Sequence, residues 1–397
     1  MYIIDDKNLD FYYRILLALS GRGVNCIPFS DIEVNDKSKP VGTFIANVDQ
    51  SFDCAKNQEF LTFLKKNKFK KALLLKYGCS NFCYNTHFNG GITIVDIPVE
   101  FHDDTNLSLF YLHIFLELIL RNEPNLPCAS EKTKKLVNLI KKISSTDATV
   151  LINGASGTGK EVISNLIHSF SSRQEKPFIA LNCAAIPEQM LESILFGHEK
   201  GAFTGAINSN LGLLRAADCG TILLDEISEM PLNLQSKLLR VIQEKRVMPI
   251  GSSSEVKVDV RIVATTNRNM FDEVKSGNFR EDLFYRLNVF PINNLNLSER
   301  IEDLISIVAH MLCKELVENG EIYLITEDAL SSLMQHSWPG NVRELDNIIQ
   351  RAKILCSQSI ITVADLIFDN DGDQAQPNTA EILAAKFKAN AASEVLS

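Results

Sequence analysis

The feature that most constrains the fold of this chain is a glycine-rich turn between an apolar strand and a helix. The predicted strand Thr149–Asn153 runs directly into Gly154–Lys160, which reads G-A-S-G-T-G-K, and a helical pattern follows over Glu161–Phe170. Glycines let the backbone N–H groups of such a turn close around phosphate oxygens, and the N-terminus of the helix adds a favourable field. The order strand, glycine turn and helix therefore predicts an α/β unit with a phosphate-binding loop.

The residues expected to bind the nucleotide are Gly154, Ser156, Gly157, Thr158, Gly159, Lys160 and Glu161. Lys160 is expected to reach the β- and γ-phosphates. Position 161 holds Glu in place of the Ser or Thr that usually touches magnesium, so the metal must rely on other ligands.

A second apolar strand supplies two carboxylates. Residues Thr221–Glu226 read T-I-L-L-D-E. Asp225 is placed to hold Mg²⁺ and Glu226 to polarise the attacking water, which is the equipment that phosphoryl transfer requires. ATP and Mg²⁺ are therefore the expected cofactors of an ATPase. Two acids at a strand end can also be a solvated turn, and a P-loop alone also fits a small-molecule kinase.

Three further motifs follow the phosphate loop. Asn182–Pro187 reads N-C-A-A-I-P, Phe196–Lys200 reads F-G-H-E-K, and Gly201–Ala206 reads G-A-F-T-G-A. Together with the loop they resemble the central AAA+ domain of the bacterial enhancer-binding proteins, the nitrogen regulatory protein C-like activators of sigma-54 RNA polymerase. The resemblance covers about residues 130–365, and the hexapeptide is its most specific part.

The resemblance implies roles for further residues. The hexapeptide Gly201, Ala202, Phe203, Thr204, Gly205 and Ala206 would engage sigma-54, with Phe203 and Thr204 at its tip. Asn182 resembles the residue that restrains the catalytic glutamate, Thr266 and Asn267 match the first sensor of the γ-phosphate, and Arg343 matches the second sensor. Arg280 and Arg286 match arginines that reach a neighbouring subunit's nucleotide. A surface salt bridge to Glu281 or Asp282 is the alternative for these arginines.

The sequence departs from the family pattern in three places, one of which is the stretch Pro124–Ser130, where the glycine normally found near the adenine is missing. Ile194 stands where the family usually has Glu, which removes a charge near the base of the hexapeptide loop. Leu297–Arg300 reads L-S-E-R in place of L-R-E-R and has lost one arginine. These departures bear on the efficiency of coupling and of nucleotide binding.

The chain divides into five predicted segments: 1–121 a receiver-like regulatory domain, 122–129 a linker, 130–295 the α/β ATPase subdomain, 296–368 a helical lid, and 369–397 a polar linker and short tail. Within the lid, residues 299–356 lack convincing strands. In the first segment, short apolar runs alternate with helical patterns, which predicts a parallel sheet covered on both sides. Asn81, Asn85 and Asn89 indicate a loop within it.

The first segment resembles a response-regulator receiver of the flavodoxin-like class. Asp5 and Asp6 stand where an acidic pair would bind magnesium, and Asp49 follows the third strand as a candidate phospho-acceptor. Ile97 occupies the position of the receiver's lysine, so the groups that stabilise a phosphoryl group are incomplete. We expect a degenerate receiver that regulates by contact with a partner, and phosphorylation at Asp49 is the alternative.

The composition of the chain argues against several other classes of protein. A net charge of −9 over 397 residues argues against a general nucleic-acid coat. Nine cysteines without paired spacing and no secretory signal indicate a cytoplasmic protein with reduced thiols. The apolar run Leu107–Leu120 is too short to span a membrane and predicts a buried helix. Cys79, Cys83 and His87 could provide three metal ligands, but a structural zinc site normally closes four.

The predicted function is ATP-driven remodelling of the closed complex of sigma-54 and its RNA polymerase. The resemblance implies that a ring of subunits, a hexamer, performs it. The alternative is a non-catalytic protein that keeps the fold and modulates other activators. The family usually ends in a helix-turn-helix, whereas Ala380–Val395 predicts one weak helix. Sequence-specific DNA binding is therefore not expected of this chain.

Overall fold

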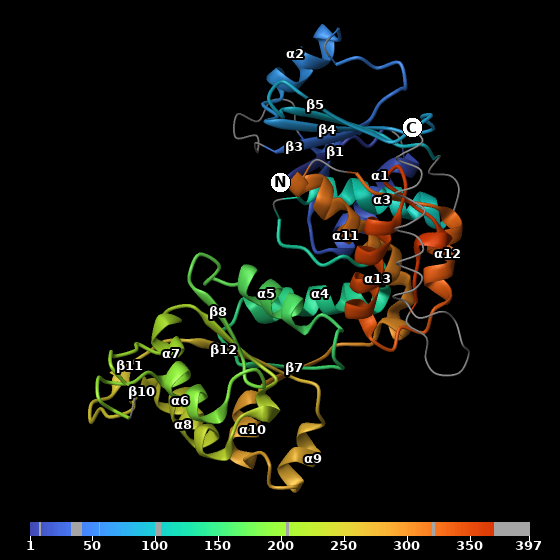
Figure 1. Ribbon diagram of the computed structural model, residues 1–397. Helices are drawn as coiled ribbons and strands as arrows, with labels where there is room; N and C mark the ends of the chain where they lie inside the picture. The colour runs from blue at the N-terminus through green and yellow to red at the C-terminus, as the bar shows by residue number, and fades with distance from the viewer. Residues whose placement is uncertain are drawn as a thin grey trace, which may run out of the picture. The chain divides into compact units, whose positions relative to one another are not determined.

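The computed structural model describes residues 1–7, 9–32, 42–54, 56–99, 105–121, 123–203, 206–319 and 322–368. The chain forms two compact units (Figure 1). The first contains Met1–Lys135, Ile301–Ser337 and the chain from Glu344 onward, and the second contains Leu136–Arg300 with Trp338–Arg343. The N-terminal residues therefore share a unit with most of the described helices after position 300.

A six-stranded sheet in the order β2-β1-β3-β4-β6-β5 forms the base of the first unit. Its strands are β1 (Tyr2–Ile4), β2 (Cys26–Pro28), β3 (Thr43–Asn47), β4 (Lys71–Lys76), β5 (Cys83–His87) and β6 (Ile92–Asp96). The aliphatic runs of β1, β3, β4 and β6 are largely buried, as expected of strands covered on both faces. All pairs except β5–β6 are parallel, which confirms the predicted α/β architecture.

Strand β5 corrects the prediction of a loop around Asn85. It pairs antiparallel with β6 at the edge of the sheet, so the sheet is mixed. Phe88, Asn89 and Gly90 adopt positive φ in the turn between the two strands, a region that Asn and Gly enter most readily. The sequence pattern failed here because β5 is half-buried or exposed along its length and has no apolar alternation. A hairpin thus stands where a crossover helix would join β4 to β6.

Helix α3 (Asn106–Ile119) confirms the predicted buried helix. Eleven of its fourteen residues are buried, which requires neighbours on several sides. It packs against α1 (Leu9–Gly21), α11 (Leu304–Asn319) and α12 (Glu327–Gln335) within the first unit. Among the described residues, no helix has the length and apolar character to cross a bilayer.

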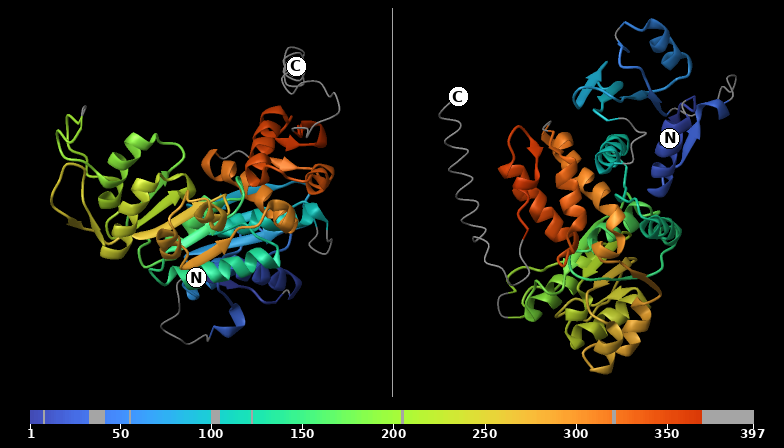
Figure 2. Two further views of the ribbon diagram at one scale, coloured as in Figure 1. Left: turned by 90° about the horizontal axis from the view of Figure 1, so that it is seen from below. Right: turned by 90° about the vertical axis from the view of Figure 1, so that its right-hand side faces the viewer.

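The helices α11, α12 and α13 (Asn341–Leu355) lie together in orange and red in Figure 2. The first unit also contains β14 (Leu324–Ile325) and β15 (Ile360–Ile361), which pair in parallel. The prediction that this region lacks strands was wrong, because a strand of two residues is too short to produce a recognisable period.

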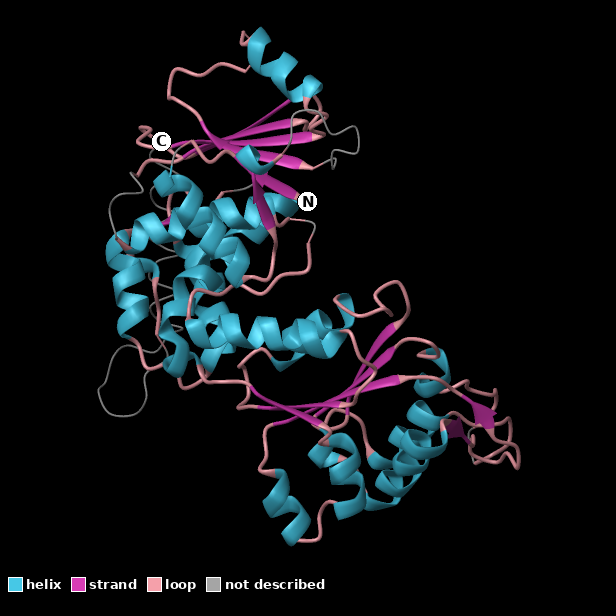
Figure 3. Ribbon diagram, turned by 180° about the vertical axis from the view of Figure 1, so that it is seen from behind, coloured by secondary structure: helices cyan, strands magenta, loops and turns pink. Residues whose placement is uncertain are grey.

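The second unit is a five-stranded parallel sheet in the order β13-β7-β12-β9-β8, with helices on both faces (Figure 3). Its strands are β7 (Val150–Asn153), β8 (Phe178–Asn182), β9 (Thr221–Asp225), β12 (Arg261–Thr266) and β13 (Phe290–Asn293). Its helices include α5 (Lys160–Ser169), α6 (Glu188–Phe196), α8 (Leu232–Glu244) and α10 (Glu281–Leu287), and α4 (Glu131–Ser144) begins in the first unit and continues into the second. This order places the carboxyl ends of β7, β12 and β9 side by side, where the predicted site residues gather.

Candidate functional site: a phosphate loop and two strand-end carboxylates

The phosphate loop joins β7 to α5, as predicted. Gly159 is the N-cap residue of α5 and has φ +95°, which the absence of a Cβ permits. Gly157 has φ +76°, and a Cβ there would lie 2.5 Å from the carbonyl oxygen of Gly340. Thr158 is buried, and its hydroxyl donates to the carbonyl oxygen of Ala155 at 2.8 Å. The glycines are therefore required by the geometry of the turn.

Lys160 lies inside this loop with only 7% of its surface exposed. Its ammonium donates to the carbonyl oxygen of Gly154 at 2.9 Å and to that of Ala155 at 3.3 Å. It lies 3.6 Å from the Glu226 carboxylate. Glu161, the next residue, is exposed on the first turn of α5. The loop thus holds one cation beside a carboxylate and a helix N-terminus, an arrangement suited to phosphate oxygens.

Asp225 ends β9 in a network of hydrogen bonds. The Thr265 hydroxyl donates to one of its oxygens, and the Asn182 side-chain amide donates to the other at 2.9 Å. The Asn182 side-chain oxygen in turn accepts the N–H groups of Ala184 and Ala185. We predicted that Asn182 restrains Glu226, but it contacts Asp225, because the two residues are register partners on β8 and β9.

Glu226 follows β9 with φ +53°, a conformation that is unusual for a residue with a side chain. Its backbone N–H donates to the Thr265 hydroxyl at 3.1 Å, and its carboxylate accepts the N–H of Asn267 at 3.2 Å. Thr265, which the sequence did not single out, therefore fixes both acids at the strand end.

The two predicted first-sensor residues occupy different environments. Thr266 is buried, and its hydroxyl donates to the Ser228 hydroxyl at 3.0 Å. Asn267 is exposed, and the backbone of this residue contacts Glu226. Thr266 thus shapes the turn after β12, whereas Asn267 faces the carboxylates.

Arg343, the predicted second sensor, reaches the glycine-rich loop. The Arg343 guanidinium donates to the Ser156 hydroxyl at 2.7 Å. In the same segment, the Val342 N–H donates to the carbonyl oxygen of Gly157, and the Asn341 amide donates to that of Ser156. The start of α13 is therefore bonded directly to the loop.

Two residues that the site prediction omitted hold the loop from the other side. The Asn294 side chain and the Arg300 guanidinium both donate to the carbonyl oxygen of Thr158, at 2.9 and 2.7 Å. Both donors are buried. Arg300 is the arginine that remains in the altered L-S-E-R segment, so its retention was the available signal.

The two arginines of the α10 region differ. Arg280 forms a bidentate pair with Asp282, at 2.6 and 3.0 Å, and also donates to the Ser236 hydroxyl. The surface salt bridge that was the alternative reading is therefore present for Arg280. Arg286 is exposed, and its guanidinium makes no hydrogen bond or ion pair with any residue that the structure describes.

The hexapeptide loop is described at its ends but not at its centre. Thr204 and Gly205 lie outside the described residues. The Gly201 N–H donates to the carbonyl oxygen of Ala206 at 2.9 Å, which closes the loop at its base, and Ala202 follows at that base. The Phe203 ring is 46% exposed and meets the His198 ring edge-on. An exposed aromatic side chain thus stands on a closed base.

The described residues at the carboxyl edge of the first unit's sheet form no comparable arrangement. Asp6 accepts the N–H of Ser30, and Asp49 lies exposed beyond the end of β3. Ile97, in place of the receiver's lysine, is fully buried. The Lys76 ammonium donates to the backbone carbonyl oxygens of Gln50 and Phe52.

The thiols and imidazole of Cys79, Cys83 and His87 do not form a metal cluster. Cys83 and His87 lie on the edge strand β5 rather than on a helix. No group of three candidate ligands is found among the residues that the structure describes.

The comparison with known families agrees with this geometry. Residues 126–293 match the model of the sigma-54 interaction domain, and residues 298–382 match the model of the AAA+ ATPase lid domain. Response regulator protein FleR of Pseudomonas aeruginosa is 49% identical over 267 residues, which are 65% of this chain and 56% of that protein. The Nif-specific regulatory protein of Enterobacter agglomerans is 46% identical over 241 residues, 61% of this chain and 46% of that protein. The chain thus spans about half the length of these curated relatives.

A solved structure resembles nearly the whole chain. NtrX from Brucella abortus in complex with ADP has a TM-score of 0.58 and 26% identity, and the match covers 96% of this chain and 88% of NtrX. This match includes the N-terminal α/β sheet, whose strand order after removal of β5 is that expected of a receiver-like domain. The chain therefore belongs to the family of sigma-54-dependent regulators, through a sigma-54 interaction domain and an AAA+ lid domain at residues 126–382.

Proposed function

We propose that this chain hydrolyses ATP and uses the reaction to remodel the closed promoter complex of sigma-54 RNA polymerase. The observation that carries the proposal is the convergence of Lys160, Asp225 and Glu226 at one sheet edge. The same unit presents the exposed Phe203 on the hexapeptide loop. An ATP site and a loop suited to a protein partner are thus built on one sheet.

The three residues would divide the chemistry of hydrolysis. Lys160 would neutralise the terminal phosphates, since the loop already encloses its ammonium. Asp225 would hold Mg²⁺, because Thr265 and Asn182 fix the orientation of its carboxylate. The metal supplies charge neutralisation when bound. Glu226 would polarise the attacking water, oriented by the Asn267 N–H.

A ring of subunits, with six as the expected number, would complete this site. An arginine finger stabilises the transferring phosphoryl group across an interface and needs an unengaged guanidinium. Arg286 is exposed without a partner in the described part of its own subunit, whereas Arg280 is held by Asp282. We therefore assign the trans role to Arg286 first, and to Arg280 only after its pair with Asp282 is released.

The hexapeptide loop would transmit the nucleotide state to sigma-54. The Ile250 N–H donates to the carbonyl oxygen of Gly197, and the Glu199 N–H donates to that of Ile250, so the base of the loop is anchored. His198 is anchored as well, by Ser193 and by the carbonyl oxygen of Asn208. ATP binding would extend the loop toward sigma-54, and hydrolysis would retract it.

The N-terminal sheet would regulate the ATPase by contact. Glu117 on α3 is buried and pairs with Arg22, which follows α1, and with His310 on α11, at 2.7 Å from the imidazole. The Glu327 carboxylate, at the start of α12, accepts the N–H groups of Asn106 and Leu107. A signal that moves α3 would therefore reach the lid helices directly. A partner protein that binds the N-terminal domain would act by this route.

The test of the proposed function separates hydrolysis from remodelling. In Thr204→Ala, the basal ATPase rate is expected to stay near that of the unaltered chain, while open-complex formation on a sigma-54 promoter is lost. The hydroxyl acts on the partner and not on the nucleotide. Ser209→Ala removes an exposed hydroxyl from the same segment and is the matched control. Retained open-complex formation in Thr204→Ala would remove the loop from the mechanism, and an unaltered chain without ATP turnover would indicate a non-catalytic regulator.

A further inference from the structure

We propose that the first unit contains a binding site for a small phosphorylated ligand, in a pocket at the amino end of its parallel strands. The pocket has a volume of about 630 Å³, within the usual range for small-molecule sites. Met1, Gly42 and Lys70, which precede β1, β3 and β4, all line it. It therefore lies at the opposite edge of the sheet from Asp5, Asp6 and Asp49, and it is separate from the phosphate loop.

Two rows of neighbouring residues on one face of the sheet contribute to the pocket lining. The first row is Tyr2, Thr43 and Lys71, which are register partners on β1, β3 and β4. The second row is Leu73, Thr93 and Thr86 on β4, β6 and β5. Register partners on adjacent strands share a face. The hairpin strand β5, which a receiver-like sheet would not contain, thus contributes directly to the pocket.

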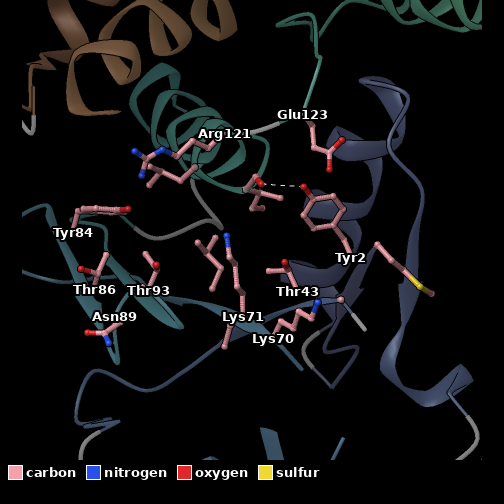
Figure 4. A pocket seen from close by; sticks show the side chains of 17 residues that line it. Tyr2, Thr43, Lys70, Lys71, Tyr84, Thr86, Asn89, Thr93, Arg121 and Glu123 are labelled. Carbon is pink, nitrogen blue, oxygen red and sulfur yellow. Dashed lines mark hydrogen bonds between the residues drawn. The ribbon is translucent and has the colours of Figure 1, made fainter. Parts of the chain in front are cut away.

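The walls come from β5 and from the end of α3. Tyr84 on β5 and Asn89 in the turn that follows lie on the same side of the pocket (Figure 4), and Leu118 and Ile119 at the end of α3 also line it. The Tyr2 hydroxyl donates to the carbonyl oxygen of Ile119 at 3.2 Å and joins the sheet to the helix end. The two tyrosines offer ring faces or edges at the pocket, which suit a planar base or sugar.

The charged side chains at the pocket are mostly cationic. Lys70, Lys71 and Arg121 line it together with a single acid, Glu123. The Lys71 ammonium points into the space between Tyr84 and Tyr2 in Figure 4. Five of the seven residues from 65 to 71 are lysines, in a chain with a net charge of −9. A local positive field of this kind draws anions toward a cleft.

The combination favours a phosphate group over other anions. Lysine ammonium groups and a guanidinium make strong charge-assisted hydrogen bonds to phosphate, and the Thr43, Thr86 and Asn89 side chains add neutral donors. A nucleic acid would need an extended groove, whereas these residues enclose a pocket. The chemical class is therefore a phosphate ester of about mononucleotide size.

Hydrogen–deuterium exchange of the full chain, read by mass spectrometry, tests this site. The probes are AMP, pyrophosphate, citrate and a short single-stranded RNA. Binding at the pocket protects peptides that contain Lys70–Thr93 and Leu118–Glu123, whereas binding at the ATP site protects Gly154–Lys160. We expect AMP or pyrophosphate to protect the pocket peptides. The double variant Lys71→Glu, Arg121→Glu should weaken that protection at least about tenfold, since two charged donors are removed.

Controls separate the pocket from general charge effects and from unfolding. Lys56→Glu alters an exposed lysine of the same unit, and its affinity for AMP should change by less than about twofold. Unchanged hydrogen–deuterium exchange of the ligand-free double variant in peptides of β3 and α1, which belong to the same unit, shows that this unit is folded. Lys71→Gln replaces the double variant if that exchange rises. No protection by either phosphate, equal protection in the double variant, or equal protection by citrate would overturn the proposal. RNA protection of Lys65–Lys68 without pocket protection would overturn it as well.

Discussion

Both sheets of this chain carry acidic residues at the carboxyl ends of their parallel strands, but the surroundings of those acids differ. In the second unit, Asp225 receives hydrogen bonds from Asn182 and Thr265, and Glu226 receives one from the Asn267 backbone. In the first unit, Asp49 lies exposed beyond its strand. The two sheets thus place carboxylates at equivalent edges, but Asp225 and Glu226 accept hydrogen bonds from neighbouring groups, whereas Asp49 lies exposed.

The lysines near the carboxyl edges of the two sheets also differ in what they contact. Lys160 lies 3.6 Å from Glu226 inside the glycine loop. Lys76, at the end of β4, donates to two backbone carbonyl oxygens, and Ile97 is an aliphatic side chain where a receiver has a lysine. Phosphoryl chemistry needs an acid and a cation held toward the same phosphate. Among the residues that the structure describes, an acid and a cation lie together in this way at the carboxyl edge of the second unit's sheet and not at that of the first.

In the first unit, the buried charged groups that contact one another lie at helix α3 instead of at the carboxyl edge of the sheet. Arg22 is fully buried and contacts Glu117, His113 and Asn125. Burial pushes the pKa of Glu117 upward, but the Arg22 charge and the His310 hydrogen bond outweigh it and hold that pKa below its usual value. Burial, aided by Arg22, lowers the pKa of His113 to about 3. The buried polar groups around Arg22 and Glu117 therefore serve packing between helices.

The largest expected effect is that of Arg286→Ala, which tests whether a neighbouring subunit completes the predicted ATP site. Arg286→Ala should lower ATP turnover by about a thousandfold, the contribution typical of an arginine finger, without changing the melting temperature of the subunit. Steady-state ATPase assays over a range of protein concentrations measure it. Mixing Arg286→Ala with Lys160→Ala subunits should restore part of the activity at composite interfaces.

Asp282→Ala is the matched control for the arginine pair. It releases Arg280 from its salt bridge and leaves Arg286 untouched, so it should not reproduce the loss. Full activity of Arg286→Ala at every protein concentration would show that the site is complete within one subunit.

A loss of comparable size is expected when the carboxylate of Glu226 is neutralised. Glu226→Gln keeps the shape of the side chain and removes the base, so ATP turnover should fall by about 10²- to 10⁴-fold. Nucleotide affinity, measured by calorimetry with ATP, should stay within a few-fold of the unaltered chain. Near-normal turnover would place the base elsewhere, with Asp225 the first alternative.

Much of the second unit could be predicted because each motif also has a local cause. Gly157 and Gly159 were recognisable because the loop requires backbone conformations that other residues avoid. The acids at 225 and 226 were recognisable because they follow a buried apolar strand. Residues that stand at the junction of an apolar strand and a turn can therefore be predicted from the sequence alone.

The parts that escaped prediction depend on tertiary contacts. Asn294 and Arg300 bond to Thr158 over more than 130 residues of sequence, and no local pattern marks such a pair. Strand β5 has no apolar period because it is an edge strand, and its formation depends on the partner β6. The contact of Asn182 with Asp225 instead of Glu226 escaped prediction for the same reason, because the register of β8 against β9 decides which acid Asn182 contacts.

A third test asks whether the buried charges of the first unit control its stability. The folded pKa of His113 is about 3 and its unfolded pKa is about 6.5, so the unfolded chain alone binds a proton between these values. Stability is therefore complete above about pH 6.5 and is lost as the pH falls. From pH 7 to pH 5, His113 should account for a loss of about 2 kcal/mol in the free energy of unfolding.

His113→Asn provides the comparison, since its side-chain oxygen can accept the Arg22 hydrogen bond without titrating. Urea titrations at the two pH values should show a smaller pH-dependent loss in this variant than in the unaltered chain. His87→Asn removes a histidine from the edge strand β5 and should keep the full loss. Equal pH dependence in His113→Asn and the unaltered chain would mean that His113 is not buried in its neutral form.

The smallest effect is expected where the comparison finds no organised site. Asp49→Ala should change basal ATP turnover by less than about twofold, as exposed substitutions usually do. Treatment of the unaltered chain with acetyl phosphate should add no phosphoryl group that mass spectrometry detects, with a phosphorylatable response regulator as the positive control. The reason is that a phosphoryl group at Asp49 would find Ile97 in place of a lysine and Lys76 already bonded to backbone oxygens. Stoichiometric labelling that Asp49→Ala abolishes would show that this edge rearranges into a working receiver site, and the contrast between the two sheets would then be one of conformation rather than of chemistry.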